Sequence, residues 1–187
     1  MTNGAGASAF EDWLQSIAMK YQLDLTTICS AGADAGSRSY HRIAAADGRS
    51  FIAMNAEGET SESFCAFIKV DGLLRGEAGL NAPEIIDVDD AHRFMLIADL
   101  GKQTYLDVLN EDNARELMDH ATTALVAWQR ISRPNVLPAY GREVLQRELD
   151  LFPTWYVGRH RGVEWTEEQQ KWWRMSTEAI LDNNCRE

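Results

Sequence analysis

The pattern of apolar and polar positions differs between the first 100 residues and the rest of the chain. Up to about residue 100, short apolar runs separated by turn residues are typical of strands, and two stretches with helical spacing lie among them. After residue 101 the apolar residues recur every three or four residues, which predicts helices. We therefore expect an α+β fold in which a β-rich part, residues 1–100, precedes a helical part, residues 101–187.

The β-rich part begins with a helix. Ser8 can cap it, and its apolar positions follow the three-four spacing. A β-prone run at 23–29 then leads into residues 30–55, SAGADAGSRSYHRIAAADGRSFIAMN, which read as strand, loop, strand, turn and strand. The pair Asp47-Gly48 favours a tight hairpin. We expect three antiparallel strands here.

The β-rich part also contains one inserted helix. Residues 59–78 carry a helical apolar stripe, Ser61 or Ser63 can cap it, and Gly79 can end it. Two further strands are predicted at 84–88 and 93–100. They complete a sheet of about five antiparallel strands.

In the helical part we expect four helices. These lie near 104–109, 113–132, 141–160 with a kink or break at Pro153, and 166–181.

Charge and composition narrow the function. The net charge is −11, the pI is about 4.8 and only four lysines occur, which argues against a nucleic-acid partner. We find no apolar run of membrane-spanning length and no signal peptide, so the expected location is the cytoplasm and no membrane is expected as a partner. The three cysteines form no CxxC pair, and we expect them to be reduced and mostly buried.

The loop that follows the first strand carries the candidate chemistry. Gly32 and Gly36 let backbone N–H groups come close to an anion. Arg38 and Arg42 add positive charge close by. Two alternatives stay open at this point, since the loop can be an ordinary surface hairpin loop and both arginines can be solvated strand residues.

Four sequence blocks together resemble a known family. They are DAGSRSYHR at 34–42, FIAMNA at 51–56, ADLG at 98–101 with QTYL at 103–106, and RELDLFPTWY at 147–156. The chain is similar to the aminoglycoside phosphotransferase superfamily. Within that superfamily it resembles the branch of cell-wall amino-sugar kinases, which phosphorylate the anomeric hydroxyl of N-acetylmuramate and N-acetylglucosamine in peptidoglycan recycling.

The resemblance implies a protein-kinase-like amino-terminal lobe followed by the first helices of an α-helical carboxy-terminal lobe. ATP would lie between the lobes, with the loop 32–39 over its phosphates and residues 98–101 as the hinge beside adenine. The candidate nucleotide-binding residues are Gly32, Asp34, Gly36, Ser37, Arg38, Ser39, Arg42, Ala98, Asp99 and Leu100. The candidate sugar-binding residues are Arg147, Glu148, Trp155 and Tyr156.

The sequence departs from the kinase pattern in two places. Residues 51–55 contain no lysine to grip the α and β phosphates, so Arg38 or Arg42 is expected to take over that charge. None of the four histidines has an aspartate two residues on, so the loop H-x-D-x-x-x-x-N is absent. No catalytic residue and no ligand of the Mg²⁺ that the complete family enzyme needs is therefore assigned to this chain.

These departures lead to the expectation of a truncated and inactive kinase. The alternative is a non-catalytic nucleotide-binding or protein-interaction module. A missing carboxy-terminal half would leave an apolar face that invites homo-oligomerisation. Two residue types have competing interpretations: Asp99 can cap the following turn, and helical-core packing is favoured over a sugar-stacking platform for Trp128, Trp155, Trp165, Trp172 and Trp173.

Overall fold

The protein is represented by a computed structural model that describes residues 8–33, 36–131 and 135–185. Contacts divide the chain into two units, Met1–Ser132 and Arg133–Glu187, and each is described here by itself. The first unit contains the sheet and all elements up to helix α4 (Ala114–Arg130). The boundary between lobes that was expected at residue 100 stays a prediction.

The first unit is built on a five-stranded sheet with the order β1-β2-β3-β5-β4, in which all neighbours are antiparallel. The predicted sheet is thus confirmed. The strands are β1 (Leu23–Ala33), β2 (Ser39–Ala45), β3 (Ser50–Asn55), β4 (Ile85–Asp89) and β5 (Phe94–Ala98).

Strand β1 continues beyond the end that the sequence predicted. It runs to Ala33 rather than Cys29, so Gly32 belongs to the strand and not to the loop. The pairing with β2 shifts register between Ser30 and Gly32, and Gly32 has a φ of +146°. A glycine adopts such a φ without strain and allows the strand to continue through the irregularity.

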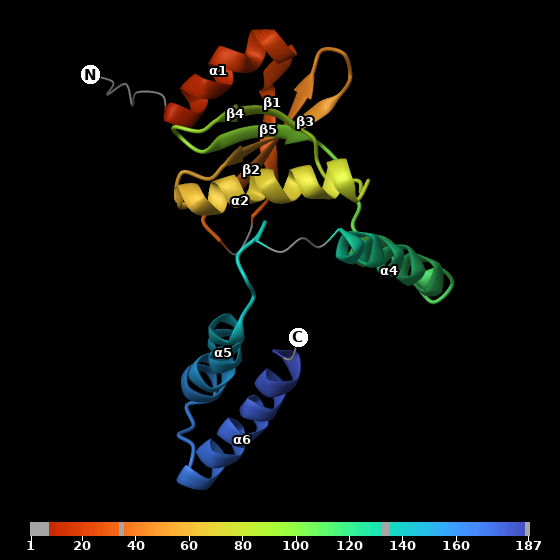
Figure 1. The fold of residues 1–187 in the computed structure, drawn as a ribbon. Helices are drawn as coiled ribbons and strands as arrows, with labels where there is room; N and C mark the ends of the chain where they lie inside the picture. Colours follow the sequence, from red (N-terminus) through yellow and green to blue (C-terminus); the bar gives the residue numbers. More distant parts are fainter. Residues whose placement is uncertain (1–7, 34–35, 132–134, 186–187) are drawn as a thin grey trace, which may run out of the picture. The chain divides into compact units, whose positions relative to one another are not determined.

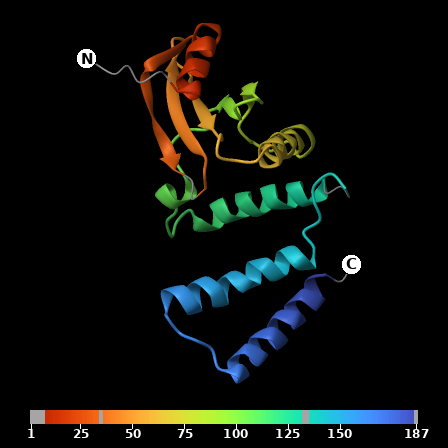
Figure 2. The ribbon, with the colours of Figure 1, turned by 90° about the vertical axis from the view of Figure 1, so that its left-hand side faces the viewer.

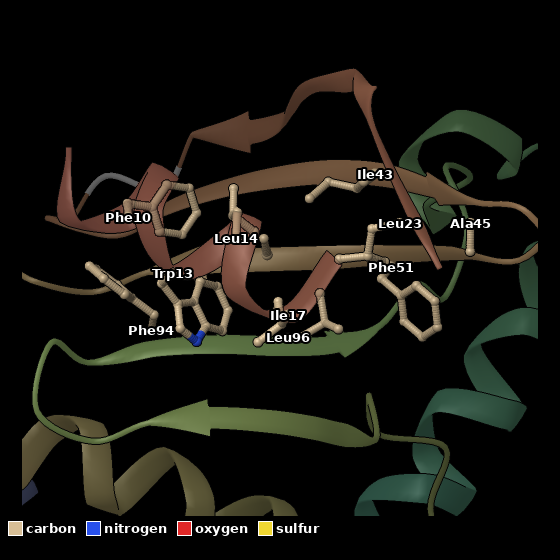
Figure 3. Packing of buried hydrophobic residues seen from close by; sticks show 11 residues of the cluster. Phe10, Trp13, Leu14, Ile17, Leu23, Ile43, Ala45, Phe51, Phe94 and Leu96 are labelled. Carbon is tan, nitrogen blue, oxygen red and sulfur yellow. The ribbon is translucent and has the colours of Figure 1, made fainter. Parts of the chain in front are cut away.

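Helix α1 (Ala9–Tyr21) covers one face of the sheet, as the apolar spacing predicted (Figure 3). Ser8 caps it in a capping box with Glu11. The rings of Phe10 and Trp13 contact Phe94, with centroids 5.1 and 5.5 Å apart. The other buried partners in this cluster include Leu14, Ile17, Leu23, Ile43, Phe51, Ala53 and Leu96.

Helix α2 (Ser61–Gly72) and the following π-helix η1 (Leu73–Glu77) lie on the opposite side of the sheet (Figure 1). Phe64 anchors α2 there among Ile52, Met54, Met95 and Ile97, and we call this side the α2 face.

The predicted caps of α2 were wrong, whereas the predicted end was correct. The cap is Thr60, whose hydroxyl accepts from the Ser63 N–H at 3.1 Å, because Thr60 has the extended backbone that a cap requires. Ser61 therefore lies in the helix, and the Ser63 hydroxyl donates to Glu59 instead. Gly79 ends the helical region with a φ of +63°, and the Leu80 N–H donates to the Leu74 carbonyl at 2.8 Å.

Two helices follow the sheet in the first unit, the short α3 (Tyr105–Val108) and α4, as the sequence predicted. Helix α4 has no buried residue within the described structure.

The second unit is a helical hairpin (Figure 2). Helix α5 (Arg142–Leu151) continues as the π-helix η2 (Phe152–His160), and α6 (Glu167–Asn184) returns along it. The break predicted at Pro153 takes the form of a change in helix type, since the α-helical stretch ends two residues before this proline, which cannot donate a backbone hydrogen bond. Helix α6 was predicted to start at Thr166; it begins one residue later, after Thr166 as its cap, and runs three residues beyond its predicted end.

The three cysteines are free but exposed, so the prediction of buried thiols was wrong. Cys29 and Cys65 belong to neither apolar cluster of the first unit. In the described residues, no helix combines the length and the apolar character needed to cross a membrane.

Candidate functional site

The sheet register separates the two predicted nucleotide-binding segments along the central strand β3. Ser39, at the end of the loop, pairs with Asn55, whereas Ala98, at the start of the hinge, pairs with Phe51. Ser50 is one residue further and donates to Asp99 at 2.6 Å. Five strand residues at about 3.3 Å each place the loop about 17 Å from Asp99.

Arg42 and Asp99 form an ion pair on the α2 face, near the start of β3. Arg42 Nε donates to Asp99 Oδ2 at 2.5 Å, and a second guanidinium nitrogen donates to Oδ1 at 2.8 Å. The same nitrogen donates to the Gly101 carbonyl at 2.9 Å. The side chain of Asp99 is only 4% exposed and that of Arg42 17%. The ion pair therefore ties strand β2 to the segment that follows β5.

This ion pair changes the expectation for both residues. The hydrogen bonds from Arg42 hold the pKa of Asp99 well below its usual range, against the opposing effect of burial, and bonds from Ser50 and the Gly101 N–H add to this. The interpretation of Arg42 as a solvated strand residue was wrong, because its charge is neutralised by Asp99. The turn-capping role of Asp99 is confirmed by the bond from the Gly101 N–H at 2.9 Å. Contact of either residue with a nucleotide stays a prediction.

Arg38 is held at the loop end by a carboxylate that the sequence analysis missed. One of its terminal nitrogens donates to Glu59 at 2.9 Å and to the Ser63 hydroxyl at 3.1 Å. The bond from Ser63 and the bond from Arg38 lower the pKa of Glu59. The Arg38 side chain is only 18% exposed, so the alternative of a solvated strand residue is wrong for this arginine too.

Glu59 also holds the loop itself. The Ser37 hydroxyl donates to Glu59 at 3.2 Å. At Gly58, an added Cβ would lie 2.9 Å from Ser37 Cβ, so the glycine allows this close approach. Glu59 immediately precedes the Thr60 cap, and that position is a sequence signal for a carboxylate near a helix N-terminus. No spacing rule connects it with an arginine 21 residues away.

The remaining nucleotide-binding candidates have different surroundings. Gly36 and Ser37 lie in the exposed loop, and the Ser39 hydroxyl is 3.2 Å from His41 Nε2. Asp34 lies outside the described residues. In the predicted hinge, the Ala98 N–H donates to the Glu84 carbonyl at 2.8 Å, so this donor already has an acceptor within the protein. The Leu100 side chain is exposed.

The sugar-binding candidates all lie in the second unit and on its surface. Arg147 and Glu148 form a 3.5 Å ion pair with each other on α5. Trp155 and Tyr156 are exposed on η2, and the Arg159 guanidinium lies 4.1 Å from the centre of the Trp155 ring.

Two hollows lie near these residues. Arg147 lines a shallow one of about 460 Å³ together with Arg142, Glu143, Gln146 and Asp150. A second hollow of about 310 Å³ is lined by Asp150, Pro153, Val157, Val163, Trp165, Gln170, Trp173 and Arg174.

The four tryptophans of the second unit divide into two groups. Trp165 and Trp173 contact each other, with ring centroids 5.5 Å apart, and both contact Phe152, which confirms packing for these two. Trp155 and Trp172 are exposed, so the prediction of core packing was wrong for them within this unit.

Comparison with known proteins gives a consistent result. Residues 27–184 match the phosphotransferase enzyme family. An N-acetylmuramate/N-acetylglucosamine kinase of Pseudomonas aeruginosa is 46% identical over 81% of this chain and 44% of its own length. The corresponding kinases of Pseudomonas putida and Neisseria meningitidis are 38% and 33% identical over 84% and 91% of this chain, and over 45% and 50% of their own lengths. The chain thus spans about half the length of these relatives.

Proposed function

Since the chain belongs to the phosphotransferase enzyme family, we propose that it forms the nucleotide-binding lobe and the first substrate-lobe helices of an ATP-dependent amino-sugar kinase. N-acetylmuramate and N-acetylglucosamine are the proposed acceptors, because they are the substrates in the names of the three relatives. The reaction would transfer the γ-phosphoryl group of ATP to a sugar hydroxyl.

The observation that carries the nucleotide part of the proposal is the separation of loop and hinge along β3. About 17 Å of strand lies between them. An extended nucleoside triphosphate can bridge such a span, with its base at residues 98–101 and its phosphates under residues 36–39. By strand alternation, Arg42, Ser50 and Asp99 lie on the same side of the sheet as the buried Ile52 and Ile97, which is the α2 face.

The loop residues fit a triphosphate through backbone donors and one arginine. The small side chains of Gly36 and Ser37 leave the main-chain N–H groups accessible. Arg38 is partly neutralised by Glu59, yet its Nε is a buried donor without an acceptor in the described residues. In phosphoryl transfer the protein mainly positions the phosphates and stabilises their charge, and these groups would hold the triphosphate in place.

The Arg42–Asp99 ion pair would position the hinge and not contact phosphate. It fixes residues 99–101 through two hydrogen bonds to the carboxylate and one to the Gly101 carbonyl. The sugar side is assigned to Arg147, Glu148, Trp155 and Tyr156 by the family resemblance, and the exposed aromatic rings suit stacking against a pyranose.

One observation favours a second candidate, a nucleotide-binding module without catalysis. None of the four histidines is followed two residues later by an aspartate, so residues 1–187 contain no family-type catalytic loop. Mg²⁺ would neutralise phosphate charge in the complete enzyme, and no ligand for it is assigned to this chain.

Calorimetric titration of residues 1–187 with ATP, in the presence and absence of Mg²⁺, tests the nucleotide site. We expect saturable binding at one site, and a thermal shift with ATP but not with inorganic phosphate. Absence of both effects in a folded sample would refute the assignment of the loop and hinge.

A further inference from the structure

Helix α6 presents apolar residues on two opposite faces. Trp173, Thr177 and Leu181 share one face, which packs within the second unit, and Leu181 is completely buried. Trp172, Met175 and Ala179 follow a spacing of three and four on the opposite face. Trp172 is 58% exposed and Met175 54%, so this second face has no cover in the described structure.

A helix that is apolar on both sides belongs inside a larger assembly. Surface helices of globular proteins show one apolar stripe and one polar side. In the hairpin of the second unit, α5 and η2 can cover only one side of α6, and the bonds from Arg142 to Glu178 and Asp182 hold α6 in that orientation. The exposed side of α6, defined by Trp172, Met175 and Ala179, is therefore an interaction surface, which we call the outer α6 face.

The lengths of the relatives indicate what covers this face. The chain matches only 44 to 50% of each relative, so each of these three kinases contains about as much polypeptide again. We infer that the outer α6 face is the docking surface for an apolar-striped helix from the carboxy-terminal half of a phosphotransferase of this family. The inference rests on family membership and on the two-sided helix, and not on the proposed nucleotide or sugar.

The experiment supplies that half as a separate polypeptide. Residues 1–187 are co-expressed with the carboxy-terminal part of the Pseudomonas aeruginosa relative that lies beyond the match, and the complex is measured by light scattering after gel filtration and by calorimetric titration. We expect a one-to-one complex. The double variant Trp172→Ser, Met175→Ser is expected to weaken binding by at least about tenfold, since tryptophan anchors dominate such interfaces.

A matched control shows whether weaker binding is specific to the outer α6 face or follows from the loss of any exposed apolar side chain. Met19 on α1 is 90% exposed, so Met19→Ser also removes an exposed methionine but lies on another unit. We expect it to leave binding unchanged. Far-ultraviolet circular dichroism of each variant shows whether the helices are retained, and Trp172→Phe is expected to restore much of the binding because it keeps an aromatic anchor.

The other outcomes overturn the inference. A stable dimer of residues 1–187 that excludes the added polypeptide would assign the face to a second copy. A monomer without binding, or equal weakening by Met19→Ser, would also refute it. Complex formation without phosphorylation of either sugar would support the docking surface and count against the proposed function, so the two can fail separately.

Discussion

At the scale of residues, two arginines of the first unit form ion pairs that tie distant segments of the chain together. Each arginine of the loop and of β2 meets a carboxylate that is distant in sequence: Arg38 meets Glu59, and Arg42 meets Asp99. These pairs lie at opposite ends of β3. They bind Arg38 in the loop, and the segment from Asp99 to Gly101, to the folded sheet unit.

Asp99→Asn tests the hinge pair. The substitution keeps the size of the side chain but leaves the largely buried Arg42 without its counter-charge, so we expect the free energy of unfolding at pH 7 to fall by about 2 kcal/mol. Chemical denaturation measures this loss. As a control, Asp47→Asn removes the exposed partner of Arg49, and we expect a much smaller change.

The loss at Asp99 should depend on pH in a defined direction. Because its pKa is lowered in the folded protein, the carboxylate stabilises the fold above about pH 4, and this stabilisation is lost as the pH falls through the lowered pKa. The difference between the wild type and Asp99→Asn should therefore persist down to pH 4 and shrink below it. A difference that is constant down to pH 2 would contradict this explanation.

Asp71 on α2 should show the opposite behaviour. Burial raises the pKa of its carboxyl group, and its Oδ1 has no partner in the described residues. A raised pKa means that the charged form is disfavoured in the fold, so this contribution falls as the pH rises through the pKa. We expect Asp71→Asn to raise the unfolding temperature at pH 7 and to have little effect on it at pH 3. The control Asp90→Asn, at an exposed position, should leave the unfolding temperature unchanged at both pH values. A lower unfolding temperature at pH 7 would count against burial as the cause.

At the scale of elements, the loop between β1 and β2 is positioned by the start of α2. Ser37 and Arg38 bond to Glu59, which lies beside the Thr60 cap, and Phe64 anchors the same helix under the sheet. The position of the loop thus depends on a helix that begins more than 20 residues later. Any shift of that helix would be transmitted to the proposed phosphate site.

Gly58→Ala tests this connection. The added Cβ would meet Ser37 at 2.9 Å and push the loop away, so we expect ATP affinity to fall by about tenfold. Gly76→Ala in η1 meets nothing within 4 Å and should leave the affinity unchanged. Calorimetric titration measures both. Equal affinities for the two variants would show that the loop position does not affect nucleotide binding.

At the scale of the whole molecule, the chain contains a complete sheet unit and helices whose apolar surface is largely exposed. The exposed large apolar residues are concentrated after residue 100, on α3, α4, η2 and α6, whereas the sheet has an apolar cluster on each face. This difference fits a protein that covers about half the length of its relatives. We therefore expect nucleotide binding and sugar phosphorylation to separate in experiments.

Residues 1–187 alone should bind ATP but not turn it over. With ATP, Mg²⁺ and N-acetylmuramate or N-acetylglucosamine, we expect no sugar phosphate, because the residues that activate the acceptor hydroxyl in such kinases are not in this sequence. A coupled assay for ADP and direct detection of the sugar phosphate check this. Robust product formation by the pure chain would overturn the expectation.

Most of the fold could be predicted from local pattern. The period of the apolar residues, the Asp47-Gly48 turn, the Ser8 cap and the terminal Gly79 all depend on a few neighbouring residues, and they define the elements and their order. The four sequence blocks in the same way indicated the family that the comparisons confirm. Exposure of Cys29, Cys65 and Trp172 could not be predicted, because burial depends on which surfaces meet in space.

The sequence by itself determined the antiparallel sheet with its helices, the loop rich in small residues, and the family. Only the tertiary structure decided that Arg38 and Arg42 form ion pairs with Glu59 and Asp99, and that these pairs lie at opposite ends of β3. The physical reason is that helix and turn signals act over a few residues, whereas an ion pair between residues 57 positions apart exists only after the strands have set their register.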